Sequence, residues 1–419
     1  MTYLKILISM ILLVPPVCAE EITVGSSLTL EQTIERVLAR SPALQSATFA
    51  AQAAAEHIGQ ARQSTPLRLN IEIENFAGSG AASGADSLET TLSLRRILES
   101  GRKPELRGEL AEQQAHLLAR EQDAQRLDLL ADTARRFVHV VSDQERLVIA
   151  NDSVALDRKI LAAVERRIST GKTAVTESRW VSIALTRSEL ELEHATHELA
   201  ASRVKLATLW GDTEPNFSAA RANLFALLSP DPFEEVQQML KRNPDLLRFA
   251  TRQRLGEARM RLAEASRRPD ITASGGLRYL NGSKDVALVA SVNIPFGSQA
   301  RAAPAIAVAR LANQREPLDY EQRRLTLYAT LFEIYQELSH SFTAAETLRK
   351  RIIPDARRAM SEYELGYAAG RYSLLELTAA QRLLLDSRLE ALVAAADYHR
   401  YRIEIDRLTG ATMTTGVVR

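Results

Sequence analysis

The sequence predicts a mainly α-helical protein with a small β part, built from two similar halves. Three observations predict this fold class. Long stretches rich in Ala, Leu, Arg and Glu favour helix, and only 18 Gly and 14 Pro interrupt the 419 residues. Two segments recur about 200 residues apart, which indicates an internal duplication. Each half also holds two short runs in which apolar and polar residues alternate, as they do in β-strands.

The charge balance argues against one broad class of function. The chain has 53 Lys and Arg against 52 Asp and Glu, a net charge of +1. A nucleic-acid binder needs a clustered excess of cationic side chains to displace counterions from the phosphates. We therefore expect no nucleic-acid partner.

Residues 1–19 are typical of a signal peptide. Lys5 gives a positive start, an apolar run follows at 6–14, and Val17-Cys18-Ala19 forms a small-residue cleavage site. Cys18, the only cysteine, would leave with this segment. Since no later run of 18 apolar residues occurs, no transmembrane helix is predicted after it. The sequence thus predicts an exported protein without a helical membrane anchor.

The duplication defines the domain organisation. Residues 38–52 match residues 240–254, and residues 171–193 match residues 370–392. A repeat near 200 residues is too long for a solenoid unit and indicates a duplicated half-structure. The expected segments are a first repeat at 20–211, a linker at 212–230, a second repeat at 231–410 and a tail at 411–419.

Each repeat is expected to hold the same elements in the same order. First comes a helix of about 35 residues, with Thr29 and Asp231 as candidate N-caps. A β-hairpin, a very long helix and a second helix follow. In the first repeat these are 66–96, 102–170 and 172–210, and in the second they are 269–296, 301–369 and 371–409.

The hairpins have the length and pattern of membrane-crossing strands. Each strand is about 9–11 residues long, which suffices for a tilted strand to cross a bilayer. Phe76, Tyr279 and Phe296 stand at strand ends, where an aromatic girdle would lie. Four strands do not close a barrel, and an open sheet edge is excluded from lipid. The pattern therefore predicts that several copies pool their strands in one barrel.

The long helices are predicted to be rods. Some 68 residues make a helix of roughly 100 Å, longer than the core of any globular domain. A coiled-coil-like stripe agrees with side-by-side packing, and its members are Leu127, Leu130, Ala134, Phe137 and Val141. Pro354 is expected to bend the second rod, and Gly171 and Gly370 to turn the chain back.

Taken together, these segments resemble the TolC family of outer-membrane efflux ducts across the whole mature chain. The resemblance is carried by LTLEQTIERVLARSPAL (28–44), VQQMLKRNPDLL (236–247), GKTAVTESR (171–179), the two hairpins and YELGYAAGRYSLLELTAAQRLLLDSRLE (363–390). It implies a homotrimer whose twelve pooled strands form an outer-membrane β-barrel above a periplasmic α-helical barrel. Residues 92–115 (LSLRRILESGRKPELRGELAEQQA) are most similar to the CzcC-like ducts of heavy-metal pumps.

The resemblance also implies site residues at the periplasmic tips. Gly171 and Gly370 correspond to the tip glycines that dock a membrane-fusion adaptor. Tyr367, Glu177 and Glu376 match positions of the family's gate, whereas Arg371 is displaced by one position from the expected basic residue. A second interpretation of both carboxylates is that they stabilise the first turns of the helices after each glycine. We leave both interpretations open.

The sequence offers one weak candidate for a metal site and none for an active site. His194 and His197 are three residues apart on a helix, a spacing that can bind a metal, but without a third ligand they are better explained as solvated surface. No phosphate-binding loop, nucleophile elbow or zinc cysteine pattern occurs. We expect no cofactor and no enzymatic activity.

The sequence therefore predicts a passive, gated outer-membrane exit duct of a Gram-negative tripartite pump. Its partners would be a periplasmic adaptor, an inner-membrane transporter of the RND type and outer-membrane lipid. The resemblance implies heavy-metal cations as cargo. Alternatives are a duct for drugs or for type I secretion with the same fold, or a periplasmic coiled-coil scaffold or adaptor.

Overall fold

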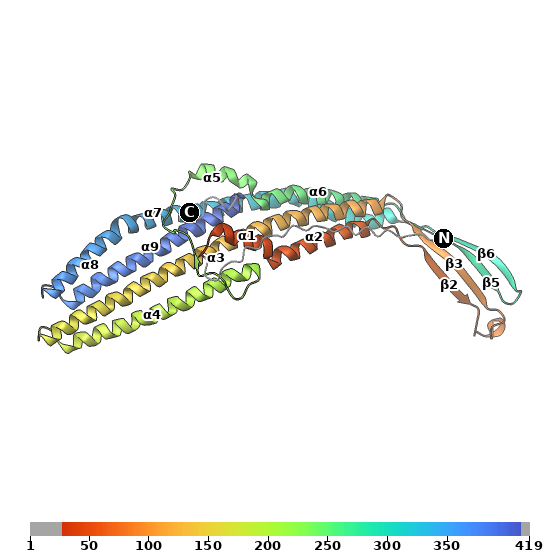
Figure 1. The fold of residues 1–419 in the computed structure, drawn as a ribbon. Coiled ribbons are helices and arrows are strands. Elements are labelled where there is room, and N and C mark those ends of the chain that lie inside the picture. The colour runs from red at the N-terminus through yellow and green to blue at the C-terminus, as the bar shows by residue number, and fades with distance from the viewer. Residues whose placement is uncertain (1–26, 412–419) are drawn as a thin grey trace, which may run out of the picture.

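The computed structural model describes residues 27–411 of the chain. The predicted signal peptide and nearly all of the predicted tail lie outside the described residues. Within residues 27–411, no helix is long and apolar enough to cross a bilayer. The described part is an elongated molecule in which a layer of long helices ends in a β-sheet at one side and in two helical hairpins at the other (Figure 1).

The first repeat begins with two helices where one was predicted. Thr29 is the N-cap of α1 (Leu30–Arg40), as predicted, and forms a capping box with Gln32. The helix then breaks at Ser41, and α2 (Pro42–Ala61) begins with Pro42. The cause is Pro42, because a residue that precedes proline is driven out of the helical region, and Ser41 has ψ 122°. The expectation of one helix of about 35 residues was wrong.

The second repeat breaks at the matching proline. Its opening elements are α5 (Phe233–Met239), the 3₁₀ turn η3 (Leu240–Arg242) and α6 (Pro244–Ala265). Asn243, with ψ 126°, caps α6 through its side-chain oxygen. The predicted N-cap Asp231 was also wrong, since Pro232 holds that position without any side-chain hydrogen bond. Proline is tolerated at a helix start, because its fixed φ suits that position and its missing N–H is not needed there.

The remaining helices follow the prediction closely. The first repeat continues with α3 (Lys103–Ser169), α4 (Val175–Ala207) and the 3₁₀ turn η2 (Thr208–Trp210). The second continues with α7 (Ser298–Thr347), the π-helix η4 (Leu348–Ile352), α8 (Ile353–Ala368) and α9 (Leu374–Thr409). The interruption predicted at Pro354 is thus a π-helical turn that ends two residues before the proline. Pro354 has no backbone N–H to donate to the preceding turn, and the wider π turn accommodates this missing hydrogen bond.

The hairpins join in one four-stranded antiparallel sheet. Its order is β2 (Arg68–Glu74), β3 (Glu89–Leu98), β5 (Ile271–Leu280) and β6 (Asp285–Asn293). The 3₁₀ turn η1 (Gly80–Ala82) lies in the loop between β2 and β3. In register, Ile71 pairs with Leu92, Leu92 with Leu277, and Leu277 with Leu288, so the alternating apolar residues of all four strands share one face.

The segment predicted as a linker has structure of its own. Within residues 212–230, β4 (Ala219–Ala220) pairs in parallel with β1 (Ser27–Leu28), which precedes the first helix. Gln144 of α3 holds β4 by a pair of hydrogen bonds to the backbone of Ala220, at 2.9 and 2.7 Å. The two strands β1 and β4 contribute Leu28 and Ala220 to the largest hydrophobic cluster of the described residues. That cluster also includes Phe137, Leu206 and Trp210.

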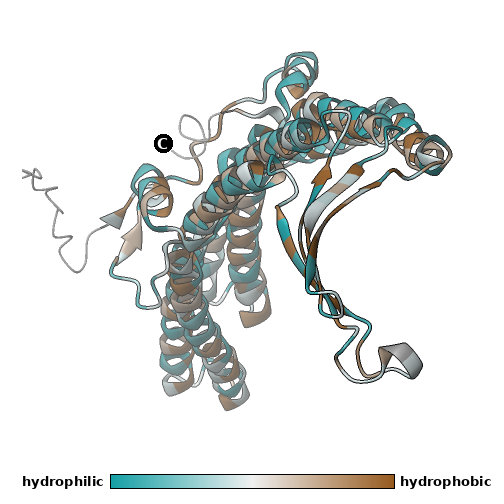
Figure 2. Ribbon diagram, turned by 90° about the vertical axis from the view of Figure 1, so that its right-hand side faces the viewer, coloured by the Kyte–Doolittle hydropathy of each residue, from teal (hydrophilic) through white to brown (hydrophobic). Residues whose placement is uncertain are grey.

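The helices form a curved layer rather than a closed bundle (Figure 2). Near the sheet, α3 packs between α2 and α6, and α6 packs against α7. Toward the hairpin ends, α3 packs between α4 and α9, and α9 packs against α7 and α8. The edges of the layer are therefore α2 and α7 in one half and α4 and α8 in the other.

Candidate functional site

Both helical hairpins turn through the same backbone motif. Gly171 and Gly370 have φ values of +68° and +79°, a region that glycine enters without steric cost. In each turn the next amide donates to a carbonyl five residues earlier, from Lys172 to Arg167 and from Arg371 to Gly366, both at 2.8 Å. This is the Schellman ending of a helix. The two predicted tip glycines thus terminate α3 and α8 in equivalent ways.

The candidate gate residues Tyr367 and Glu177 are in direct contact. The Tyr367 hydroxyl donates to Oε2 of Glu177 at 3.0 Å, which joins the end of α8 to the first turn of α4. The Tyr367 side chain is only 2% exposed. Burial, followed by the hydrogen bond to Glu177, raises the pKa of Tyr367 to about 12. The phenol therefore stays protonated and remains the donor throughout the physiological pH range.

Glu376 lies in a different environment. Its carboxylate accepts from the backbone N–H and the hydroxyl of Ser373, both at 2.8 Å, and the Ser373 hydroxyl accepts from the Glu376 amide at 3.3 Å. This capping box begins α9. The hydrogen bonds from Ser373 lower the pKa of Glu376, because they favour the ionised form. Glu376 therefore serves as a helix cap in this structure, whereas Glu177 both lies in a first turn and binds Tyr367.

Arg371, the displaced basic residue, makes its contact through the backbone. Its amide donates to Gly366, and within residues 27–411 its side chain has no hydrogen bond or ion pair. The basic side chain near Tyr367 is instead that of Arg167, in the last turn of α3. Sequence reasoning missed Arg167, because its relation to Tyr367 depends on two hairpins that are 200 residues apart.

Two further aromatic residues of the tip were also missed. The ring of Tyr372 lies 4.7 Å from that of Tyr363, measured between centroids. A Cβ at Gly366 would lie only 2.1 Å from the ring of Tyr372, so any larger residue there would require this ring to move. A glycine within a helix, between Tyr363 and Tyr367, is a sequence signal for such close packing.

The sheet separates apolar from polar side chains. Its apolar face is exposed, with Leu69 at 62%, Ile71 at 62% and Leu288 at 87%. On the opposite face Arg278 bridges three strands, with bonds to Glu74 at 3.0 Å, to Glu89 at 2.7 Å and to Thr91 at 2.9 Å. A large exposed apolar surface of this kind marks a site that contacts lipid or protein.

The histidine pair stands apart from these features. His197 lies 3.6 Å from Glu193 on the same helix, and His194 is likewise exposed on α4. Within residues 27–411, no group of three or more potential metal ligands comes together. The structure therefore adds no ligand to the pair.

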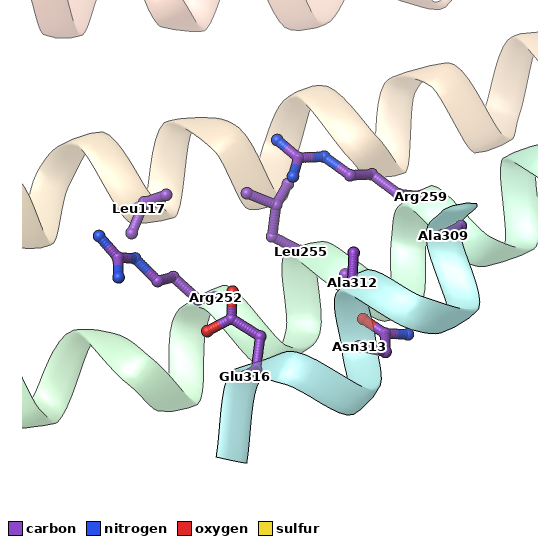
Figure 3. Close-up of a pocket in the computed structure, with 9 residues that line it drawn as sticks. Leu117, Arg252, Leu255, Arg259, Ala309, Ala312, Asn313 and Glu316 are labelled. Atoms are coloured by element: carbon purple, nitrogen blue, oxygen red, sulfur yellow. The ribbon is translucent and has the colours of Figure 1, made fainter. Parts of the chain in front are cut away.

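A cavity of about 140 Å³ lies between α3, α6 and α7 (Figure 3). Leu117 and Leu255 line it together with the polar side chains of Arg252, Arg259 and Glu316. It is far smaller than typical ligand pockets, which are about 300–1,000 Å³. This cavity is therefore not a candidate ligand site.

The combination of paired helical hairpins and an amphipathic sheet at the other end of the rods defines a class of membrane-channel protein. A family model described as "Outer membrane efflux protein" matches residues 33–212 and 236–411, which are the two repeats. The chain therefore belongs to the outer membrane efflux protein family, and the predicted family and efflux function are confirmed.

Individual relatives agree with this assignment. The chain is 29% identical over 328 residues to the cobalt-zinc-cadmium resistance protein CzcC of Cupriavidus metallidurans, covering 77% of each chain. Crystal structures of CusC share the fold with a TM-score of 0.72 at 18% identity, covering 93% of this chain and 94% of that one. The outer membrane protein VceC of Vibrio cholerae also gives a TM-score of 0.72, at 16% identity, with coverage of 91% and 96%. The predicted fold class is confirmed by these structures.

Proposed function

We propose that three copies of this chain form a gated duct through the outer membrane, as the exit component of a tripartite efflux pump. The observation that carries the proposal is the four-stranded sheet with an exposed apolar face at one end of rods of roughly 100 Å. The unpaired edges of β2 and β6 are excluded from lipid unless another chain pairs with them. Pooling twelve strands from three chains closes the sheet, with the face of Arg278 toward the lumen.

The edges of the helical layer support the same assembly. Exposed apolar residues occur at every seventh position along α7, a coiled-coil spacing, and they are Leu311, Leu318, Leu325 and Phe332. At the other edge, none of the 20 residues of α2 is buried, although this helix is rich in Ala. Each edge thus presents a surface that a second copy would cover.

Exposed charges of both signs lie on the edges nearer the tips. Exposed acidic residues on α4 include Glu191 and Glu198, and exposed basic residues on η4 and α8 include Arg351 and Arg357. Within residues 27–411, none of these four side chains has an ion-pair partner. At 1.5 Å per helical residue, the two acids lie roughly 30–40 Å from Gly171 and the two basic residues roughly 20–30 Å from Gly370. Glu191 and Arg351 are therefore nearest in height, where the α4 edge of one copy would meet the α8 edge of the next.

The pump partners and the cargo are part of the same proposal. The tips at Gly171 and Gly370 would dock a periplasmic adaptor, which in turn binds an inner-membrane RND transporter. The similarity to CzcC supports divalent metal cations as cargo, cobalt, zinc and cadmium among them. Loss of the hydrogen bond from Tyr367 to Glu177 would let the tip helices separate and open the duct. Solute would then leave by diffusion.

Three measurements test the proposal. Purified protein in planar bilayers should give discrete channel openings, and native mass spectrometry in detergent should give the mass of three chains. Deleting the chain from its host should lower tolerance to zinc, cobalt and cadmium, and the wild-type chain should restore it. Recovery of a water-soluble monomer without channel activity would overturn the duct. Lost tolerance to organic toxins, with metal tolerance unchanged, would overturn the proposed cargo alone.

A further inference from the structure

Arg167 extends from the end of α3 onto the other helical hairpin. Its Nη1 donates to the backbone carbonyl of Tyr367, and its guanidinium carbon lies 4.5 Å from the centroid of the Tyr367 ring. Its Nη2 lies 4.0 Å from where a Cβ would stand at Gly370. One side chain of the first repeat therefore contacts both the backbone and the ring of a residue in the second.

These contacts fix the orientation of the Tyr367 ring. The guanidinium is held over the ring while the ring hydroxyl reaches Oε2 of Glu177 on α4. The carbonyl that Arg167 binds also accepts from the Gly370 amide at 3.0 Å, so Arg167 binds to the turn itself. Tyr367 thus lies between a cation from α3 and a carboxylate from α4, and a cation over the ring face is attracted by the ring quadrupole.

We propose that Arg167 is a positioning residue for the periplasmic gate. It holds Tyr367 in the orientation that bonds Glu177, and so keeps the α8–α9 hairpin against the α3–α4 hairpin in each protomer. The inference rests on the proposed duct function. It assigns to Arg167 the basic role that Arg371 does not fill within the described structure.

Arg166 offers a matched control in the same helical turn. It has the same charge and length, but it is exposed, and within residues 27–411 its side chain has no hydrogen bond or ion pair. Loss of a positive charge at the tip is therefore common to both alanine variants, whereas the contact with Tyr367 belongs to Arg167 alone.

The experiment compares single channels of the full-length protein in planar bilayers. Arg167→Ala should raise the ratio of open to closed states by about two- to five-fold, as loss of one cation–π contact predicts. Arg166→Ala should match the wild type. Arg167→Lys should be intermediate, since an ammonium keeps the charge but loses the planar fork. In a Tyr367→Ala background, Arg167→Ala should have a smaller effect than in the wild type, because the ring contact is already lost and only the hydrogen bond to the carbonyl of residue 367 remains.

Two outcomes would overturn the inference. One is an Arg167→Ala trace identical to that of Arg166→Ala, and the other is that the effects of Arg167→Ala and Tyr367→Ala simply add. If Arg167→Ala does not assemble, Arg167→Gln, which keeps donors without charge, decides by the same comparison. Absence of wild-type channels would instead overturn the duct proposal, so the two failures are distinguishable.

Discussion

At the scale of single residues, two similar carboxylates have different environments. Glu177 and Glu376 each stand six residues after a tip glycine. Glu177 accepts a hydrogen bond from a buried tyrosine, whereas Glu376 closes a capping box with Ser373. The two interpretations left open from the sequence, gate residue and helix cap, therefore apply to different carboxylates. The cap alone accounts for the contacts of Glu376, and the gate proposal applies to Glu177.

This difference gives a prediction for glutamine variants. Glu177→Gln should raise the open-to-closed ratio about five-fold, because a charged acceptor becomes a neutral one and the bond loses about 1 kcal/mol. Glu376→Gln should leave the ratio unchanged, since glutamine also completes a capping box. Single-channel recording of both variants checks this. Equal behaviour of the two variants would contradict the assignment.

At the scale of elements, the sheet has two faces that differ in chemistry. Neighbouring residues of β6 test this directly, because Leu288 lies on the exposed apolar face and Val289 on the face shared with Arg278. The register aligns the apolar residues of all four strands on one face of the sheet. A substitution on one strand therefore tests the environment of that whole face.

We expect Leu288→Lys to block assembly in the outer membrane, because a lysine on a lipid-facing strand costs about 2–4 kcal/mol near the bilayer centre. Val289→Lys should assemble normally, since its side chain would reach water in the lumen. The yield of detergent-extracted trimers from the outer-membrane fraction is the measurement. The reverse order of yields would mean that the polar face meets lipid.

At the scale of the whole molecule, both edges of the helical layer remain uncovered in one chain. Acidic residues of α4 and basic residues of η4 and α8 are exposed, and Glu191 and Arg351 lie at similar heights above the tips. Flanking charges of this kind set the partner and register of coiled coils more than they set stability. They are therefore suited to align three identical chains.

Charge reversal tests this alignment. Arg351→Glu with Arg357→Glu should lower the fraction of trimers at low salt and reverse its salt dependence, because like charges then face each other and added salt screens their repulsion. Adding Glu191→Lys and Glu198→Lys in the same chain should restore trimers, since the ion pairs re-form with reversed sign. Native mass spectrometry after extraction gives the fractions. No rescue by the second pair would contradict the proposed pairing of these edges.

The sequence by itself determined the element types, because they depend on local periodicity and on breakers. Alternation of apolar and polar residues predicted the strands, and the scarcity of Gly and Pro predicted the long helices. Gly171 and Gly370 predicted the turns. It also contained the signal for the break at Pro42, which the duplicated Pro244 repeats, although the helix-forming residues on either side of Pro42 favour one continuous helix.

Only the tertiary structure decided which side chains meet. The contact of Arg167 with Tyr367 joins residues 200 positions apart, and the pairing of β3 with β5 joins the two repeats in one sheet. Such contacts depend on how the rods pack over tens of residues, and local pattern contains no measure of that packing. For the same reason the helix cap at Glu376 and the interhelical hydrogen bond at Glu177 became distinguishable only when their partners, Ser373 and Tyr367, were placed beside them.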